Sequence, residues 1–289
     1  MVYDVAIVGM GPAGLQAALY TCRAGLSTIV IGKDGGALSK ASMIENFFGQ
    51  KEPVCGGELL ENTKKQASRL GAVLIEDEIF HIDWTGGFEL TGKTDSYSAV
   101  CVLLATGSQR KSAGIDGLER LEGHGVSYCA VCDAFFYRGR KIAVLGWADY
   151  ALSELSHLVP VASEAVLLTD GKEITAEFPS EVKIFSGEIK SIDGADRVEG
   201  VSFKDGTRLS TDAVFVALGS AGALDLARKV GALTEGRSIV TDDEMATNVP
   251  GLYAAGDCTG GLLQISKAVG EGAKAAMAMI KFVRQSKKA

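Results

Sequence analysis

The stretch YDVAIVGMGPAG, at residues 3–14, decides the fold of the first part of the chain. An apolar run of high strand propensity leads directly into glycines in the pattern G-x-G-x-x-G. In this pattern the first glycine permits a tight turn, the second lets the backbone approach a pyrophosphate, and the third allows the helix to pack closely on the strand. The phosphate then lies at the helix N-terminus. The stretch predicts a dinucleotide site with Gly9, Gly11 and Gly14 in these places, and an ordinary glycine turn is the alternative.

A βαβ unit of this type occurs twice. In the first, apolar residues recur at helical spacing up to Cys22, Gly25 ends the helix, and residues 27–31 form a second buried strand. In the second, we expect a strand at 141–145, a turn and helix at 146–159, and a strand at 164–168. Strand-rich sequence follows each unit and ends in ATG at 105–107 or ALG at 217–219. The halves therefore look like diverged copies of one plan.

The last part of the chain predicts a discontinuous first domain. The segment GLYAAGD at 251–257 is a strand that ends at a Gly-Asp turn, and a long Ala-rich helix follows over 265–283. This strand and helix have a place if they return to complete the first domain. We therefore expect an α/β fold of two Rossmann-like three-layer domains, with residues 113–240 inserted between 1–112 and 241–289.

Composition and charge exclude several classes of protein. The 289 residues are 47% hydrophobic and 22% charged, which is a globular profile and not that of a collagen, coiled coil or disordered chain. The formal charge of −7 disfavours binding to nucleic acid or to an anionic membrane surface. No apolar run is long enough to cross a membrane, and no segment resembles a secretory signal. We therefore expect a cytoplasmic protein.

The segment CAVCD at 129–133 is the second chemical signal. Two cysteines at this spacing can close a small disulfide, and a helix start beneath them would favour the thiolate. A zinc site is the rival interpretation, but it needs four ligands, and the remaining cysteines offer no second pair while His124 stands alone. We expect a redox dithiol, no metal site, and buried thiols at the other cysteines.

Six motifs together resemble a known family. GMGPAG at 9–14, GGAL at 35–38, IENFFG at 44–49, ATG at 105–107, CAVCD at 129–133 and GDCT at 256–259 occur in an order and at distances similar to those of the low-molecular-weight thioredoxin reductases. The resemblance covers nearly the whole chain. It implies a homodimer whose first domain holds FAD and whose inserted domain carries the dithiol and normally binds NADPH. One departure is Ala37, where the family usually has Gln.

The same resemblance implies roles for individual residues. In the dithiol, Cys132 would lie next to the flavin, Cys129 would attack the partner disulfide, and Asp133 would donate a proton. The implied cofactor-binding residues are Gly9, Gly11, Pro12, Ala13, Gly14, Lys33, Gly36, Leu38, Asn46, Thr106, Gly107, Asp257, Gln264 and Ile265. Among these, Asp257 would bind the pyrophosphate-ribityl region, whereas Gln264 and Ile265 would face the isoalloxazine ring.

The inserted domain departs from the family at its nucleotide loop. The phosphate fingerprint should repeat at Gly146, but Trp147 and Ala148 follow, and a methyl group where the backbone must touch a pyrophosphate removes the room. The next strand leads into Thr169-Asp170-Gly171, which would meet a 2′-phosphate with like charge. NADPH is therefore disfavoured. Asp170 could instead hold the ribose of NADH, and a solvated turn aspartate is the plainer interpretation.

A reductase without a nicotinamide site needs another electron donor. The branch that lost these motifs is the ferredoxin-dependent flavin thioredoxin reductases, and the chain resembles that branch. We expect ferredoxin as donor and thioredoxin as acceptor, with Arg110, Lys111 and the terminal lysines as candidates for a basic docking area. The alternatives are an NADH- or NADPH-linked reductase, an oxygen-linked dithiol oxidase and a non-enzymatic flavin sensor. Asp133 beside the cysteines argues against the sensor.

Overall fold

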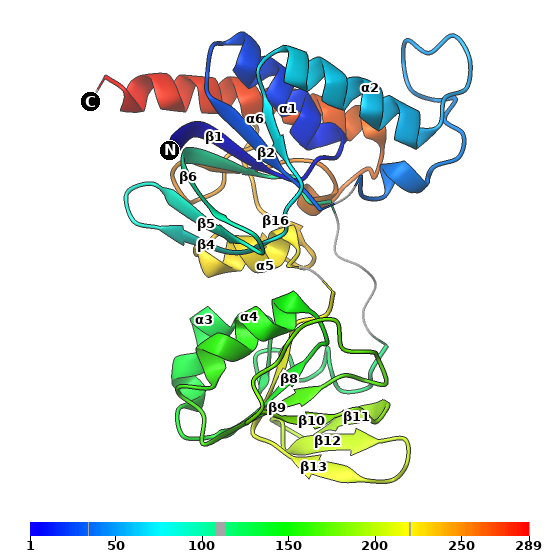
Figure 1. The fold of residues 1–289 in the computed structure, drawn as a ribbon, viewed down its shortest axis with the longest axis vertical. Helices are drawn as coiled ribbons and strands as arrows, with labels where there is room; N and C mark the ends of the chain where they lie inside the picture. The colour runs from blue at the N-terminus through cyan, green and yellow to red at the C-terminus, as the bar shows by residue number, and fades with distance from the viewer. Residues whose placement is uncertain (34, 108–113, 220, 289) are drawn as a thin grey trace. The chain divides into compact units, whose positions relative to one another are not determined.

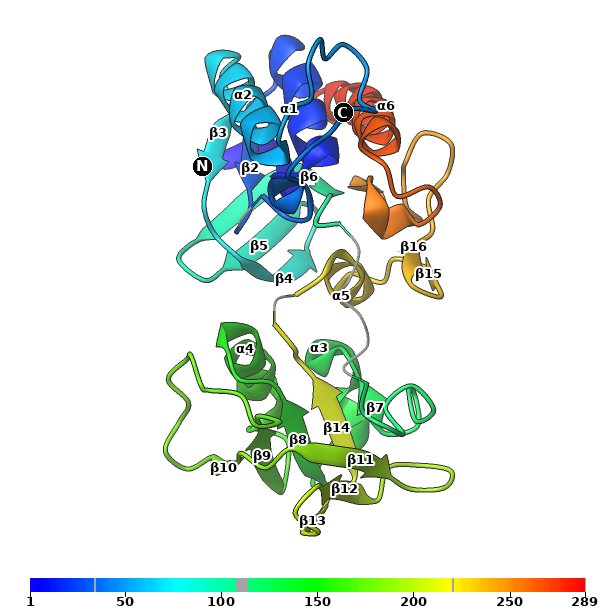
Figure 2. The ribbon, with the colours of Figure 1, turned by 90° about the vertical axis from the view of Figure 1, so that its right-hand side faces the viewer.

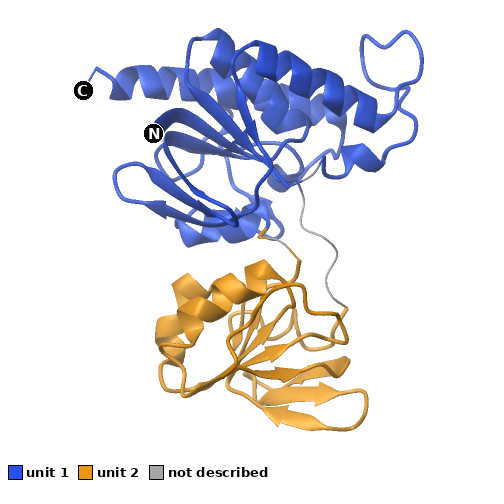
Figure 3. Cartoon of the chain, in the orientation of Figure 1, with its two compact units in different colours: residues 1–109, 222–289 blue, residues 110–221 orange. Residues whose placement is uncertain are grey.

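The glycine-rich stretch joins strand β1 (Val2–Val8) to helix α1 (Pro12–Arg23) in the computed structural model, which describes residues 1–33, 35–107, 114–219 and 221–288. The chain divides into unit 1, residues 1–109 and 222–289, and unit 2, residues 110–221 (Figure 3). The expected inserted domain ended at residue 240, whereas this division places residues 222–240 in unit 1. The reason is local, because α5 (Ala223–Lys229) contacts β4, and the Lys229 ammonium donates to the Phe80 carbonyl at 2.9 Å.

Unit 1 is built on a mixed sheet with β1 near its centre. The strand order is β3-β2-β1-β6-β5-β4, and β17 also pairs with β6. The pairs β1–β2, β2–β3, β1–β6 and β6–β17 are parallel, whereas β4, β5 and β6 pair in antiparallel fashion. The remaining strands of this sheet are β2 (Thr28–Ile31), β3 (Val73–Ile75), β4 (Ile79–Trp84), β5 (Phe88–Gly92), β6 (Ser96–Leu104) and β17 (Leu252–Ala254).

Helices α1, α2 (Gly56–Arg69) and α6 (Ile265–Ser286) pack together on this sheet (Figure 1). The core between them joins apolar residues of β1 and β6 to the inward faces of α1 and α6, including Ile7, Leu103 and Met279. Short elements complete the unit, namely η1 (Leu38–Lys40), β15 (Thr234–Glu235), β16 (Ser238–Ile239) and η3 (Asp257–Thr259). The end of the chain therefore completes the layer that its beginning starts.

Unit 2 has three layers of its own (Figure 2). Its parallel sheet has the order β10-β9-β8-β14-β7, and a separate antiparallel sheet has the order β11-β12-β13. The core between the two sheets includes Leu145, Val214 and Phe203. The strands are β7 (Val126–Ser127), β8 (Lys141–Leu145), β9 (Glu164–Leu168), β10 (Lys183–Phe185), β11 (Ile189–Asp193), β12 (Gly200–Phe203), β13 (Arg208–Ser210) and β14 (Ala213–Val216). The helices are α3 (Ala130–Asp133), η2 (Ala134–Tyr137) and α4 (Asp149–Leu158).

The predicted fold class is confirmed. Both βαβ units form, as β1-α1-β2 in unit 1 and as β8-α4-β9 in unit 2. Within the residues that the structure describes, no helix combines the length and the apolar character needed to span a bilayer.

Candidate functional site

The loop between β1 and α1 has the geometry of a phosphate cradle. Gly9 has a φ of +120°, in the region that favours glycine, and a Cβ there would overlap the Ala105 carbonyl oxygen. A Cβ on Gly14 would overlap the Gly9 carbonyl oxygen, whereas the space around Gly11 is open. Helix α1 begins at Pro12, and its first N–H groups have no partner within the helix. The loop fits a pyrophosphate at the helix N-terminus.

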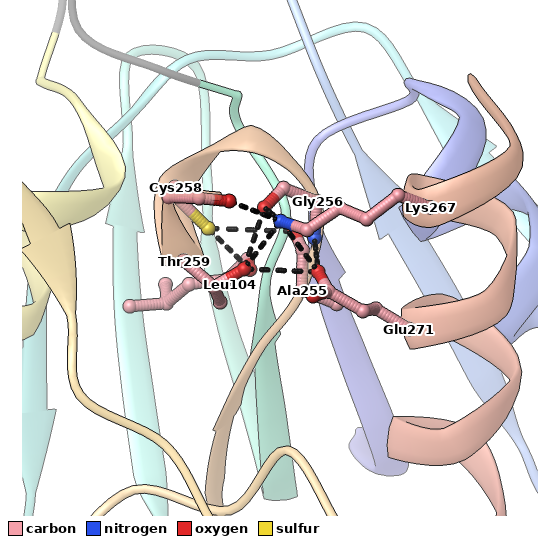
Figure 4. A network of polar contacts seen from close by, with 8 residues as sticks. Leu104, Ala255, Gly256, Cys258, Thr259, Lys267 and Glu271 are labelled. Atoms are coloured by element: carbon pink, nitrogen blue, oxygen red, sulfur yellow. Dashed lines mark hydrogen bonds and ion pairs between the residues drawn. The ribbon is translucent and has the colours of Figure 1, made fainter. Parts of the chain in front are cut away.

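An ion pair at the start of α6 fixes the turn that contains Asp257 (Figure 4). The Lys267 ammonium lies 3.0 Å from the Glu271 carboxylate, and the two side chains are only 16% and 17% exposed. Lys267 donates to the carbonyl oxygens of Gly256 at 2.8 Å and Gly260 at 2.6 Å. Glu271 accepts from the Gly256 N–H at 2.8 Å. The Lys267–Glu271 pair therefore binds both a backbone N–H group and backbone carbonyl oxygens of this turn.

The same turn lies against the start of α1. Gly256 has a φ of +88°, and a Cβ on it would be 3.1 Å from the Ala13 Cβ. A Cβ on Gly272 of α6 would overlap the Ala13 carbonyl oxygen. The structure thus brings Ala13 and the Asp257 turn together in unit 1, although they are far apart in the sequence.

Two residues predicted for the flavin side meet through a hydrogen bond. The Asn46 amide donates to the Gln264 side-chain oxygen at 3.2 Å, across 218 positions of sequence. Ile265 follows as the first residue of α6, and Thr106 and Gly107 follow the end of β6. Thr106 is exposed, so it is accessible to a ligand.

The segment after β2 carries the remaining predicted cofactor residues. The Lys33 ammonium lies 2.8 Å from a Glu78 carboxylate oxygen, so this lysine already has an anionic partner within the chain. Gly36 has a φ of +60°, which favours glycine. Leu38 opens η1 and packs half-buried against the core of unit 1.

The two cysteines of the CAVCD segment form a disulfide at the start of α3. Cys129 and Cys132 are bonded, with their Cα atoms 5.3 Å apart. Cys129 is the N-cap of α3, and its Sγ accepts from the Cys132 N–H at 3.2 Å. Cys129 is only 4% exposed, whereas Cys132 is exposed. A thiolate at Cys129 would therefore be stabilised by a backbone donor.

Ser127 fixes the position of Asp133. Its hydroxyl donates to the Asp133 Oδ2 at 2.6 Å and accepts from the Cys129 N–H at 3.1 Å. Ser127 ends β7 and is 5% exposed. The Ser127 hydroxyl therefore links the Asp133 carboxylate to the backbone N–H of Cys129, which fixes the carboxylate relative to the dithiol segment.

Exposed apolar side chains flank Cys132 in the sequence. Phe135 and Phe136 are 75% and 74% exposed, and Val131 is 42% exposed. Tyr137 is turned inward against Phe215, with ring centroids 5.8 Å apart. Burial, followed by the charge of Asp133, raises the pKa of Tyr137. The exposed rings next to the disulfide form an apolar surface of the kind that contacts another protein.

The loop after β8 differs from the loop after β1. The first glycine is equivalent in the two loops, since a Cβ on Gly146 would overlap the Ala217 carbonyl oxygen as one on Gly9 would overlap that of Ala105. The difference lies in the residues that follow. Trp147 and Ala148 are half-buried, and the Trp147 carbonyl accepts from the Thr175 N–H at 2.9 Å. Asp170 has a φ of +49°, and its carboxylate accepts from the Ile189 N–H at 2.7 Å. That carboxylate therefore accepts a hydrogen bond from the backbone of unit 2, as expected for a turn aspartate.

The cysteines outside the dithiol differ in exposure. Cys101 and Cys258 are fully buried, and burial raises the pKa of the Cys258 thiol to about 12. Cys22 is half-buried and Cys55 is exposed, so the expectation of buried thiols is wrong for Cys55.

Two further points concern the docking candidates and a possible metal site. Arg110 and Lys111, named as docking candidates, lie outside the described residues. In the described ranges, no cluster of three or more histidine, cysteine or acidic residues could hold a metal ion.

Sequence analysis did not single out Ser127, Lys267 or Glu271. The Lys267–Glu271 pair had one available signal, its i,i+4 spacing at the start of a predicted helix. Ser127 had none, because its contacts depend on how β7 leads into α3.

Comparison with known proteins agrees with this arrangement. The family model of the pyridine nucleotide-disulphide oxidoreductases matches residues 3–272. A thioredoxin reductase of Treponema pallidum is 37% identical, covering 97% of each chain, and one of Aquifex aeolicus is 35% identical, covering 99% of this chain and 95% of that protein.

Solved structures are similar over the whole chain. The atypical thioredoxin reductase TRi of Desulfovibrio vulgaris Hildenborough is 38% identical with a TM-score of 0.91, covering 98% of both chains. A ferredoxin-flavin thioredoxin reductase of Clostridium acetobutylicum is 33% identical with a TM-score of 0.74, also covering 98% of both. Proteins of this family are FAD-binding flavoproteins, which confirms the predicted cofactor class. The chain therefore belongs to the pyridine nucleotide-disulphide oxidoreductase family and is a homologue of the low-molecular-weight thioredoxin reductases.

Proposed function

We propose that the protein passes electrons from ferredoxin, through FAD and the Cys129–Cys132 dithiol, to thioredoxin. The observation that carries the choice of donor is the loop after β8. A nicotinamide nucleotide needs open space at the second glycine of its phosphate loop, and the corresponding position is Ala148, next to the indole of Trp147.

Two further contacts support this choice. Thr175 donates to the Trp147 carbonyl, so the segment after β9 is bonded to the loop where a pyrophosphate would lie. The Asp170 carboxylate is bonded to the Ile189 N–H, which leaves it poorly placed to hold a ribose hydroxyl as well. The ferredoxin-flavin thioredoxin reductase of Clostridium acetobutylicum, at 33% identity, adds support from similarity.

The residues of unit 1 fit FAD. Gly9, Gly11 and Gly14 with Pro12 and Ala13 would hold the pyrophosphate, and the Asp257 turn would contact its ribityl side. Asn46, Thr106, Gly107, Gln264 and Ile265 would lie along the flavin, and Lys33, Gly36 and Leu38 toward the adenosine. When bound, the flavin supplies a carrier that can take single electrons from ferredoxin and deliver a pair to a disulfide.

The dithiol then reduces thioredoxin in two exchanges. The Cys129 thiolate attacks one sulfur of the thioredoxin disulfide, which forms a mixed disulfide and releases the other thioredoxin sulfur as a thiolate. Asp133 delivers a proton to that leaving sulfur. Cys132 attacks the Cys129 sulfur, which re-forms the Cys129–Cys132 bond and releases the second thioredoxin sulfur. Thioredoxin gains two electrons, and the protein returns to its disulfide form.

The exposed rings of Phe135 and Phe136 support a protein substrate. They extend from the turn after Cys132 and have no role in the core of unit 2, since both are about three-quarters exposed. We propose that thioredoxin docks on them.

The electron flow is favourable. A ferredoxin near −400 mV and a thioredoxin near −270 mV differ by about 130 mV, which is about 6 kcal/mol for two electrons.

An anaerobic assay of thioredoxin reduction tests the donor. The enzyme is supplied in turn with reduced ferredoxin, NADPH and NADH, and thioredoxin thiols are counted by alkylation. We expect turnover with ferredoxin only, and none in the Cys129→Ser and Cys132→Ser variants, which keep their flavin. Rapid flavin bleaching and turnover with either nicotinamide nucleotide would refute the donor. Peroxide formation from a small dithiol, without thioredoxin turnover, would instead indicate an oxidase.

The order of attack is tested by trapping. Cys129 is buried and Cys132 is exposed in the disulfide form, so the proposed order requires the Cys129 sulfur to become accessible after reduction. With reduced enzyme, Cys132→Ser should trap thioredoxin as a stable mixed disulfide through Cys129. Trapping by Cys129→Ser alone would reverse the two roles.

The homodimer remains a prediction of the family resemblance, and the cytoplasmic location remains a prediction from the composition and segments of the sequence. Sedimentation of the flavin-loaded protein at several concentrations tests the dimer.

A further inference from the structure

A buried carboxylate lies beneath the dithiol. Glu154, on α4, is 1% exposed, and its Oε2 accepts from the Ala130 N–H at 2.7 Å. Ala130 follows Cys129 directly and is the first residue of α3. The first N–H groups of a helix have no partner within it, so Glu154 supplies an acceptor that α3 lacks.

The charge of this residue needs an explanation of its own. Burying a carboxylate costs more free energy than burying a neutral acceptor, and an amide side chain of the same length could accept the same hydrogen bond. Cys129 is itself only 4% exposed, so water has little access to its side chain. A buried charge one residue along the backbone therefore acts on this sulfur with little screening.

A second carboxylate, that of Asp133, lies on α3 itself. Asp133 is hydrogen-bonded to Ser127, which also accepts from the Cys129 N–H. The helix start and the Cys132 N–H favour a thiolate at Cys129, whereas the two carboxylates oppose it. The balance of these groups sets how readily the disulfide accepts electrons.

We propose that Glu154 is a positioning residue that holds the start of α3 and keeps the reduction potential of the Cys129–Cys132 disulfide low. Reduction creates negative charge at Cys129, and the Glu154 carboxylate repels it, which destabilises the reduced form. A dithiol with a low potential is a strong donor, as a reductase of thioredoxin requires. This inference rests on the proposed dithiol chemistry.

The test measures the dithiol equilibrium of the flavin-loaded protein without ferredoxin or thioredoxin. The protein is equilibrated anaerobically with reduced and oxidised dithiothreitol. In this exchange the Cys129–Cys132 bond breaks, the cyclic dithiothreitol disulfide forms, and two electrons and two protons pass to the protein. Acid quenching and alkylation then distinguish the forms by mass, since the reduced chain has six thiols and the oxidised chain has four.

We expect Glu154→Gln to shift this equilibrium about tenfold toward the dithiol, which corresponds to about 30 mV for two electrons. Glutamine can still accept from the Ala130 N–H, so the shift reports the charge and not the loss of the bond. Glu181→Gln is the matched control, because it removes one charge from an exposed position of unit 2 and should leave the equilibrium unchanged.

A shift of less than threefold in Glu154→Gln, or a shift toward the disulfide, overturns the proposal. Glu154→Met provides the same test if the glutamine variant does not fold, since it also removes the charge. Failure of this test leaves thioredoxin turnover intact, whereas failure of the proposed function removes turnover whatever the dithiol potential.

Discussion

Replacing Lys267 by methionine should loosen the turn that holds Asp257. The ammonium donates to two carbonyl oxygens, lies 3.0 Å from Glu271, and belongs to a side chain that is 16% exposed. Methionine fills similar space but leaves these oxygens and the buried carboxylate without their cation. Breaking a buried pair by removing one partner costs about 3–5 kcal/mol, and the partial exposure here lowers our expectation to about 2–4 kcal/mol.

The effect is measured by thermal unfolding and by flavin release. A loss of about 2–4 kcal/mol corresponds to a fall in Tm of roughly 5–15 °C for a unit of this size. FAD fluorescence on dilution reports the dissociation of the cofactor, which we expect to be at least tenfold weaker. The double variant Lys267→Met with Glu271→Met removes the unpaired carboxylate and should recover part of the lost Tm. If Lys267→Met unfolds within 2 °C of the wild type and retains its flavin, the pair does not hold the turn.

Three other perturbations give separate tests. Gly9→Ala should yield protein without flavin, because its Cβ would overlap the Ala105 carbonyl at a φ of +120°. The control Gly25→Ala has a φ of +79° but open space around its Cβ, so it should keep its flavin. Absorbance at the flavin band of the purified proteins distinguishes these outcomes. Asp133→Asn should slow thioredoxin reduction by about a hundredfold in single turnover with flavin spectra unchanged, and an equal rate would exclude it as proton donor. Burial raises the pKa of Asp4, but hydrogen bonds from Lys287 and Ser27 outweigh it and hold that pKa below its usual value. The stability it contributes is therefore fully present above about pH 4 and is lost as the pH falls through the folded pKa, so urea unfolding should separate Asp4→Asn from wild type at pH 7, by an amount that shrinks as the pH is lowered below about 4. An equal stability of the two proteins at about pH 7 would contradict this.

The local pattern of the sequence predicted the parallel strands well. Strands β8 and β9 have the predicted bounds, because short apolar runs between turn residues leave little choice of limits. The phosphate loop was equally clear, since the positions of Gly9 and Gly14 are imposed by backbone contacts that only glycine permits.

Contacts between distant segments were not predictable from these patterns. Residues 222–240 belong to unit 1 because α5 packs against β4, about 140 positions earlier, and no composition change marks that boundary. The bond between Glu154 and Ala130 joins two helices whose approach depends on how the sheet of unit 2 is wound. The burial of Cys129 beside the exposed Cys132 likewise arises from packing and not from the C-x-x-C spacing.

The discontinuity of unit 1 has a consequence for biosynthesis. Strand β17 pairs with residues 102–104 of β6, and α6 covers α1, but both are translated only after the whole of unit 2. At about 5–20 residues per second, the ribosome needs roughly 5–20 s to make the intervening segment. During that interval the nascent chain exposes an unpaired β6 edge and the bare side of α1, whereas the continuous unit 2 can fold as it emerges. We expect newly made unit 1 to depend on chaperones until its last helix leaves the ribosome.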